Sequence, residues 1–214
     1  MVEDKDIMKT GTTTVGVVCK DGIILAADKR ATSGYLISSK KIDKIHKITD
    51  YIAVTMAGTA SDAQLLVRLA QAELRLKKIR VGKEVTAKEA ANLMARMVYS
   101  NIRKLSLIPG VSHFVLGGKD DTGFHLFDLY ADGSITEVDD FISSGSGSVM
   151  AYGVLETLYR KDITIDEGVK LVVKCINAAM QRDIASGNGI DVISITQEGV
   201  KKILEKEIDV RVQI

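Results

Sequence analysis

Short runs of β-branched and apolar residues recur along the chain, with glycine-containing turns between several of them. The first two runs are separated by Lys20-Asp21-Gly22, a turn signal that predicts two neighbouring strands. Runs of four to eight such residues are typical of buried strands. The expected strands are 13–19, 23–27, 51–57, 114–118, 124–130, 135–141, 190–196 and 200–204.

Two longer segments with helical periodicity follow the third strand. The first helix is expected to open at Ser61, because Gln64 follows in capping-box spacing, and the second at Thr86 with Glu89. Apolar residues at helical spacing predict the buried face of the first helix. This stripe comprises Leu65, Leu69, Ala72, Leu76 and Ile79.

A second pair of helices is expected over 149–159 and from Thr164 to Asp183, the latter capped by Glu167. The order is therefore strands, two helices, strands, two helices, strands. Strands with turn-length connections pair antiparallel, and helix pairs can cover the outer faces of two stacked sheets. We predict an α+β fold, a four-layer α/β/β/α sandwich of two antiparallel sheets, with no boundary that divides residues 12–214 into domains.

The composition narrows the classes of function. The chain has 214 residues and a formal net charge of +1, which gives no reason to expect a nucleic-acid or membrane partner. The charged start of the chain is not expected to be a signal peptide, and no apolar run is long enough to span a bilayer. Cys19 and Cys175 are expected to be reduced core residues of a cytoplasmic protein.

No metal or cofactor is expected. The three histidines are scattered and form neither a zinc motif nor an obvious Ser–His pair: His46, His113 and His125. The glycine-serine run at 143–148 precedes a helix and could form an anion nest or only a flexible loop with an N-cap. It lacks the lysine of a P-loop and does not fit the dinucleotide fingerprint, so nucleotide binding is the weaker hypothesis.

The segment Gly11-Thr12-Thr13-Thr14 has two interpretations. It could be a frayed tail leading into an edge strand. Alternatively, a cut before Thr12 would expose a threonine whose own α-amine, with an unperturbed pKa of about 7.7–8.0, could take the proton of its hydroxyl. The glycine before the cut would leave room for the hydroxyl to attack the preceding carbonyl.

Several other positions could support such a nucleophile. Asp28 ends an apolar strand, and Lys44 shares a face with Ile42 and Ile48 if its segment is extended, so the two could form a buried pair. The simpler interpretation of both is a solvated strand edge. Asp183 closes the apolar stripe of the last helix and could equally be a surface residue at a frayed end.

Gly58 lies between a strand and a helix. Its N–H could donate a hydrogen bond to an oxyanion, or the residue could serve only a turn. Ser186 and Gly187 follow Asp183 where a helix C-cap is expected.

Taken together, these residues resemble the β-subunits of the 20S proteasome, of the prokaryotic, archaeal type, within the N-terminal-nucleophile hydrolases. The resemblance covers nearly the whole chain, in order. The matching segments are 11–16, 27–32, Lys44, 57–58, 62–64, 145–148, 152–156 and 182–192.

The resemblance implies roles for individual residues. Thr12 would be the nucleophile and its α-amine the base, with the electrostatics set by Asp28 and Lys44. Gly58 would donate to the oxyanion, and residues 1–11 would be a propeptide removed by self-cleavage between Gly11 and Thr12. The amine and a catalytic water would be oriented by Ser146, Asp183 and Ser186. The pocket for the residue before the cut would be lined by Ala31, Met56 and Ala60.

The implied activity is that of a threonine endopeptidase that degrades unfolded proteins in the cytoplasm, with cleavage after hydrophobic residues. The implied partners are other β-subunits in a seven-membered ring, outer rings of α-subunits, and an ATPase unfoldase docked on the α rings. Three alternatives stay open: the simpler two-ring bacterial relative, an amidohydrolase of small substrates from the same superfamily, and a ring scaffold that never matures.

Overall fold

The computed structural model describes residues 11–208 and contains a first antiparallel sheet in the order β10-β1-β2-β11-β12. The central strands β1, β2 and β11 are buried on both faces, which explains why 23–27 is a continuous apolar run rather than an alternating one. The strands are β1 Thr14–Cys19, β2 Gly22–Asp28, β10 Phe141–Ser144, β11 Gly189–Thr196 and β12 Gly199–Glu207.

A second antiparallel sheet has the order β5-β6-β7-β8-β9, and a two-stranded ribbon is formed by β3 and β4. The strands of the second sheet are β5 Ile45–Lys47, β6 Ile52–Gly58, β7 Ser112–Asp120, β8 Gly123–Leu129 and β9 Ile135–Val138. The ribbon strands are β3 Ala31–Ser33 and β4 Leu36–Ser39.

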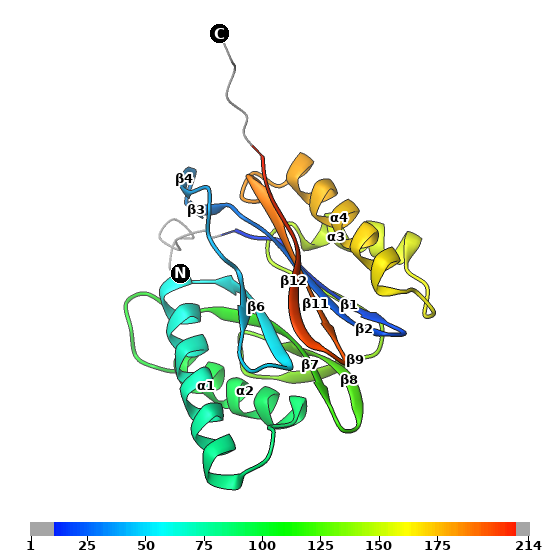
Figure 1. The fold of residues 1–214 in the computed structure, drawn as a ribbon. Coiled ribbons are helices and arrows are strands. Elements are labelled where there is room, and N and C mark those ends of the chain that lie inside the picture. The colour runs from blue at the N-terminus through cyan, green and yellow to red at the C-terminus, as the bar shows by residue number, and fades with distance from the viewer. Residues whose placement is uncertain (1–10, 209–214) are drawn as a thin grey trace.

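Helix pairs cover the outer faces of the two sheets (Figure 1). One pair, α1 and α2, packs on the second sheet, and the other, α3 and α4, packs on the first. The helices are α1 Ala60–Val81, α2 Ala87–Ile102, α3 Ser148–Leu158 and α4 Ile165–Arg182. The predicted four-layer α/β/β/α sandwich is therefore confirmed.

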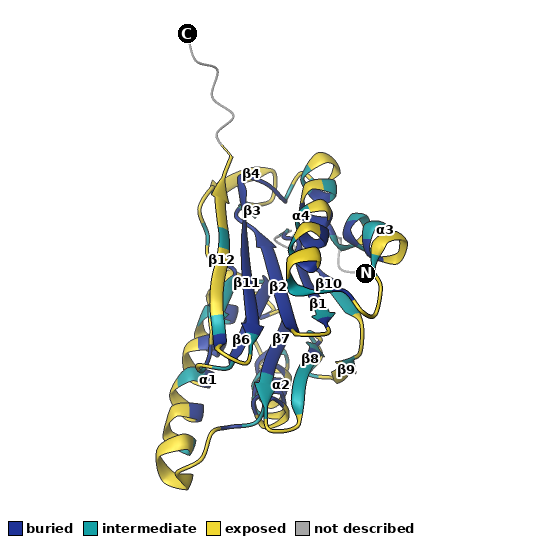
Figure 2. Ribbon diagram, turned by 45° about the vertical axis from the view of Figure 1, so that its right-hand side comes forward, coloured by how far each residue is buried: buried dark blue, intermediate teal, exposed yellow. Residues whose placement is uncertain are grey.

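A third apolar layer lies between the two sheets. Ile23, Leu25 and Ile193 of the first sheet contact Val115 and Leu126 of the second. Figure 2 shows the central strands buried, whereas β12 at the edge of the first sheet is largely exposed. Burial of apolar side chains on both faces of each sheet supplies the main driving force that holds the layers together.

The predicted buried stripe of α1 is wrong. Leu65 is 43% exposed and Ile79 is 69% exposed. The helix has apolar residues on two faces, so its periodicity alone could not choose between them. The face that packs on the sheet comprises Ala63, Leu66, Val67, Ala70 and Leu74. The expected Ser61 cap is also wrong, because the N-cap is Thr59, with no side-chain capping bond.

The capping boxes at Thr86 and Thr164 are present as predicted, with Glu89 and Glu167 as the partners. The expected strand 135–141 is instead two strands that belong to different sheets. β9 pairs with β8 in the second sheet, and β10 pairs with β1 in the first. The chain crosses between the layers at residues 139–140, which a continuous β-pattern does not reveal. Within residues 11–208, no helix is long and apolar enough to cross a bilayer.

Candidate active site

The site forms where the start of β1 meets the end of β2. The backbone N–H of Asp28 donates to the carbonyl of Thr13 at 3.1 Å, which continues the ladder between the two strands. Thr12 precedes β1 and is almost fully buried, and Asp28 closes β2 and is fully buried. The register of two adjacent strands therefore brings Thr12 beside Asp28, 16 positions away in the sequence.

The carboxylate of Asp28 is saturated with donors. Its Oδ1 accepts from the Lys44 ammonium at 2.6 Å, from the Thr13 N–H at 2.9 Å and from the Thr12 hydroxyl at 3.4 Å. Its Oδ2 accepts from the N–H groups of Arg30 and Gly187 at 3.0 and 2.9 Å. These bonds compensate the cost of burying the charge.

Lys44 is buried beside Asp28, as expected for an inward-facing residue of this segment. Burial lowers the pKa of the Lys44 ammonium below its ordinary value, and the neighbouring Asp28 carboxylate opposes that shift. The carbonyl of Lys44 accepts from the Met56 N–H at 2.8 Å, which ties the segment to β6. An ammonium group and the Thr12 hydroxyl thus share one carboxylate oxygen.

A hydroxyl cluster lies on the other side of Thr12. The Thr12 N–H donates to Ser146 Oγ at 3.2 Å, and Ser146 Oγ donates to the Asp183 carboxylate at 2.7 Å. Ser186 donates to the same carboxylate oxygen at 2.6 Å and lies 2.6 Å from the Thr13 hydroxyl. Asp183 is itself the C-cap of α4, so the helix end, rather than a later glycine, presents the carboxylate.

The turn after β10 fits only a glycine at position 145. Gly145 has φ +93°, and an added Cβ would lie 2.1 Å from the carbonyl oxygen of Thr12. This close approach lets Ser146 reach the Thr12 nitrogen. The glycine-serine run therefore contacts Thr12, and its last residue begins α3.

A small cavity of about 50 Å³ opens beside Thr12 and Lys44. The three residues expected to line a substrate pocket all line it: Ala31, Met56 and Ala60. Gly58 lines it too, with φ +106°, and an added Cβ would lie 2.2 Å from the Val111 carbonyl oxygen. The backbone at Gly58 can therefore approach the cavity in a way that no other residue allows.

Gly11 is packed against the same residues that surround Thr12. Its N–H donates to Thr32 Oγ1 at 3.3 Å, and an added Cβ would lie 2.0 Å from the Ala185 Cβ. The remainder of the expected propeptide, residues 1–10, lies outside the described residues.

Sequence reasoning assigned no role to three residues that contribute to the site: Thr13, Arg30 and Thr32. Thr13 contacts both Asp28 and Ser186. The Arg30 guanidinium donates to the Ile184 carbonyl and to the Asn188 side chain, which holds the loop after α4. All three lie inside the quoted motif segments, but nothing in their spacing separates them from ordinary strand residues.

The expectation of no Ser–His pair is contradicted. Ser144 Oγ lies 2.8 Å from His113 Nδ1, and His113 Nε2 is hydrogen-bonded to Asp128. The sequence separation of 31 residues between Ser144 and His113 hides this contact, since it forms only when the two sheets stack.

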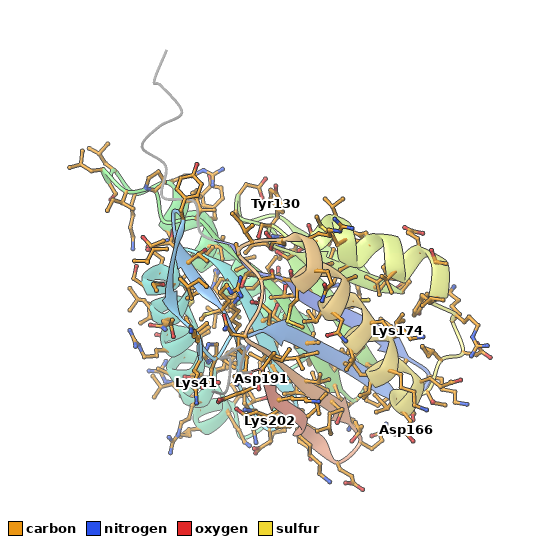
Figure 3. All side chains as sticks on the ribbon, turned by 90° about the horizontal axis from the view of Figure 1, so that it is seen from above. Lys41, Tyr130, Asp166, Lys174, Asp191 and Lys202 are labelled. Carbon is orange, nitrogen blue, oxygen red and sulfur yellow. The ribbon has the colours of Figure 1, made fainter. Side chains whose placement is uncertain are left out.

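One group of carboxylates has the spacing of a metal site: Asp43, Asp191 and Glu205. The buried Lys29 ammonium lies among them, 2.9 Å from Asp191 and 2.8 Å from Glu205. Hydrogen bonds from Lys29 and Lys202 lower the pKa of Glu205 to about 2. Figure 3 shows Asp191 and Lys202 close together at β11 and β12, and the cluster is an ion-pair network in which an ammonium supplies the positive charge.

Comparison with known proteins gives a consistent family. Residues 8–195 match the family model described as Proteasome subunit. The chain is 47% identical to "Proteasome subunit beta" of Methanocaldococcus vulcanius, over 95% of this chain and 89% of the relative. It is 46% identical to proteins of the same name from Methanococcus maripaludis, over 96% and 92%, and from Ferroglobus placidus, over 98% and 97%. The chain therefore belongs to the proteasome subunit family and is similar throughout to archaeal β-subunits.

Proposed function

We propose that this chain is a catalytic β-subunit of a 20S proteasome, a threonine endopeptidase whose nucleophile is Thr12. The observation that carries the proposal is the placement of Thr12 between two polar groups. Its hydroxyl shares Asp28 Oδ1 with the Lys44 ammonium, and its nitrogen contacts Ser146 Oγ. A nucleophile needs a nearby base and a polarising charge, and this arrangement offers both on opposite sides of one residue.

In the proposed activation, the Thr12 hydroxyl attacks the carbonyl carbon of Gly11. The C–N bond breaks as the acyl group moves from nitrogen to oxygen, and the hydroxyl proton ends on the Thr12 nitrogen. Water then hydrolyses the ester, so residues 1–11 leave as a carboxylic acid and the Thr12 hydroxyl is restored. The Ser146–Asp183 bond is well placed to orient the freed amine and a water.

Peptide hydrolysis would repeat this chemistry between molecules. The freed amine takes the hydroxyl proton, the Thr12 oxygen attacks the substrate carbonyl, and the Gly58 N–H donates to the oxyanion. The Lys44 charge favours the deprotonated oxygen. The small, mostly apolar lining of the cavity, which includes Ala31, Met56 and Ala60, supports cleavage after hydrophobic residues.

The proposal extends to assembly and location. Seven-membered β rings, outer α-subunit rings and an ATPase unfoldase that feeds unfolded proteins would be the partners, in the cytoplasm. Exposed apolar side chains on α1 support an assembled state, since Leu69, Leu76 and Ile79 remain accessible in the single subunit. No cofactor is included in the proposal.

The decisive experiment is Thr12→Ala, with Thr157→Ala as the matched control. Thr157 is exposed on α3, where it donates to the carbonyl of Gly153. Intact mass should show loss of residues 1–11 in the wild type and in the Thr157 variant only. Peptide hydrolysis should disappear with Thr12→Ala while the folded state persists, because the substitution removes few atoms.

The second candidate function is a ring scaffold that never matures. It predicts that residues 1–11 stay attached in the wild-type particle and that no peptide is hydrolysed. Intact mass of the purified wild type therefore separates the two functions before any variant is made.

A further inference from the structure

Ser144, His113 and Asp128 form a chain of polar contacts that crosses from one sheet to the other. Ser144 ends β10 in the first sheet, whereas His113 and Asp128 belong to β7 and β8 in the second. Ser144 Oγ lies 2.8 Å from His113 Nδ1, and His113 Nε2 is hydrogen-bonded to Asp128. A carboxylate can only accept, so in the neutral imidazole Nε2–H donates to Asp128 and Nδ1 accepts from the Ser144 hydroxyl.

This arrangement of serine, histidine and aspartate does not make a second nucleophile. Ser144 is only 3% exposed, and it is not among the residues that line the cavity beside Thr12. A hydrolase serine must reach a substrate carbonyl, which a buried strand residue cannot do. The network therefore acts through the residues next to it.

Ser144 is joined directly to the part of the site that holds Thr12. It precedes Gly145, whose close approach to the Thr12 carbonyl leaves no space for a side chain. Ser146 follows and accepts from the Thr12 N–H. A shift of Ser144 therefore moves Ser146 relative to the nucleophile.

His113 is joined in the same way to the oxyanion side of the site. In the second sheet it pairs with Ala57, and its neighbour Ser112 pairs with Gly58. The carbonyl of Val111 accepts from the Thr59 N–H at 2.8 Å, so residues 111–113 fix the backbone on both sides of Gly58. The Tyr130 ring packs edge-on against the His113 ring, with centroids 4.9 Å apart.

The two halves of the proposed site thus come from different sheets. The apolar layer between the sheets resists separation, but it is non-directional and does not by itself fix sliding. A hydrogen bond is directional and does. A displacement of about 1 Å between reacting groups can cost on the order of 10²-fold in rate.

We propose that Ser144, His113 and Asp128 are positioning residues that set the distance between the Gly58 N–H and Thr12 by linking the two sheets at the site. Together with the Lys44–Asp28 pair they flank the site with two polar links between the layers. This inference rests on the proposed function, because it assigns the network a role in the reaction of Thr12.

The test is steady-state hydrolysis of a chromogenic peptide by the assembled, processed particle. Ser144→Ala deletes one oxygen, and Ser144→Thr restores a hydroxyl at the same place. His113→Leu removes the other partner. The matched control is His125→Leu, at the far end of β8, where His125 binds Glu137 and Thr122 in a similar network.

We expect Ser144→Ala and His113→Leu each to lower kcat about 5- to 20-fold with KM within about twofold of the wild type. Ser144→Thr should recover kcat to within about twofold, and the Ser144→Ala/His113→Leu pair should be no slower than either single variant, because both break one contact. His125→Leu should leave kcat unchanged.

Three results would overturn the inference while the proposed function survives. The first is an active wild type with unchanged kcat in Ser144→Ala. The second is an equal loss of kcat in His125→Leu. The third is failure of Ser144→Ala to assemble while Ser144→Thr assembles, which would show a purely structural role. A processed wild type without peptidase activity would instead overturn the proposed function and this inference with it.

Discussion

At the scale of single residues, the buried charge of Asp28 organises the site. Three backbone N–H groups, one hydroxyl and one ammonium converge on its two oxygens. The amides come from segments on both sides of the sheet, so the carboxylate would keep most of its hydrogen bonds if a single donor were lost. This allows the contribution of the ammonium to be measured separately from the fold.

Lys44→Met tests that contribution. The variant should remain folded, but it should lose about 3 kcal/mol of unfolding free energy because a buried carboxylate loses its cation. Its kcat should fall about 10²-fold or more, since a charge near the developing oxyanion and the hydroxyl is removed. Urea unfolding and peptide hydrolysis measure the two effects.

Lys41→Met is the matched control for Lys44→Met. Its ammonium pairs with Glu207 in a largely exposed position, so its unfolding free energy should change by less than about 1 kcal/mol. Wild-type kcat in the Lys44 variant would contradict the role proposed for its charge.

Gly11 tests the geometry of self-cleavage. Gly11→Ala places a Cβ 2.0 Å from the Ala185 Cβ and 2.7 Å from Ser146 Oγ, so the scissile bond must shift away from Thr12. Processing should slow by about 10-fold or more, as expected when reacting atoms are displaced. The time course of propeptide loss, followed by intact mass, gives the rate.

Gly153→Ala is the control for this variant, since an added Cβ there meets no atom within 4 Å. It should process at the wild-type rate. Equal rates in the Gly11 variant and the wild type would show that residue 11 is not constrained during cleavage.

At the scale of elements, α1 separates helical periodicity from burial. Leucines occur on two faces of the helix, and only the face with Leu66 and Leu74 packs on the second sheet. The choice of face is set by what lies beneath the helix. The same reason explains the crossing at 139–140, where the strand pattern continues but the chain changes sheets.

Leu74→Ala and Leu69→Ala distinguish the two faces with one chemical change. Leu74 is 1% exposed, so its truncation leaves a cavity and should cost about 2–5 kcal/mol. Leu69 is 45% exposed in the single subunit, so its truncation should cost less than about 1 kcal/mol. Urea unfolding of the unassembled subunit measures both, and a larger cost at Leu69 would restore the face predicted from the sequence.

At the scale of the whole molecule, the stacking of two sheets both creates the site and buries the two thiols. Cys19 and Cys175 lie in the apolar layer between the first sheet and helices α3 and α4. Burial raises the pKa of each thiol from 9.0 to about 12. Both cysteines are free and act as small apolar residues in the folded protein.

The raised pKa values predict a loss of stability at high pH. Between pH 9 and 12 the folded state keeps protons that the unfolded thiols release, so the stabilisation is complete below about pH 9 and declines as pH rises toward 12. Each thiol contributes up to about 1.4 kcal/mol per pH unit in that window. Urea unfolding of the wild type and of Cys19→Ala/Cys175→Ala across pH 8–11 measures the slope.

The double variant should be less stable at pH 8 because of the lost packing, yet its unfolding free energy should fall less steeply with pH. Parallel slopes in the two proteins would contradict the assigned burial of the thiols. Tyr159, whose pKa is also raised to about 12, is present in both proteins and cancels in the comparison.

The sequence by itself determined the local features of this protein. β-branched runs located most strands, and the pairs Thr86–Glu89 and Thr164–Glu167 placed two helix starts correctly, because these signals depend only on neighbouring residues. The order of elements was enough to predict the four layers. The motif segments also named Thr12, Asp28 and Lys44, which the structure brings together, while their roles in catalysis stay a proposal.

Only the tertiary structure decided which surfaces and side chains meet. The buried face of α1, the change of sheet after Val138, and the contact of Ser144 with His113 all depend on how separate layers pack. Periodicity along the chain reports which side chains share a face, but it carries no information about what covers that face. Contacts between distant segments are fixed by the joint packing of the layers, so they emerge only when the whole core is assembled.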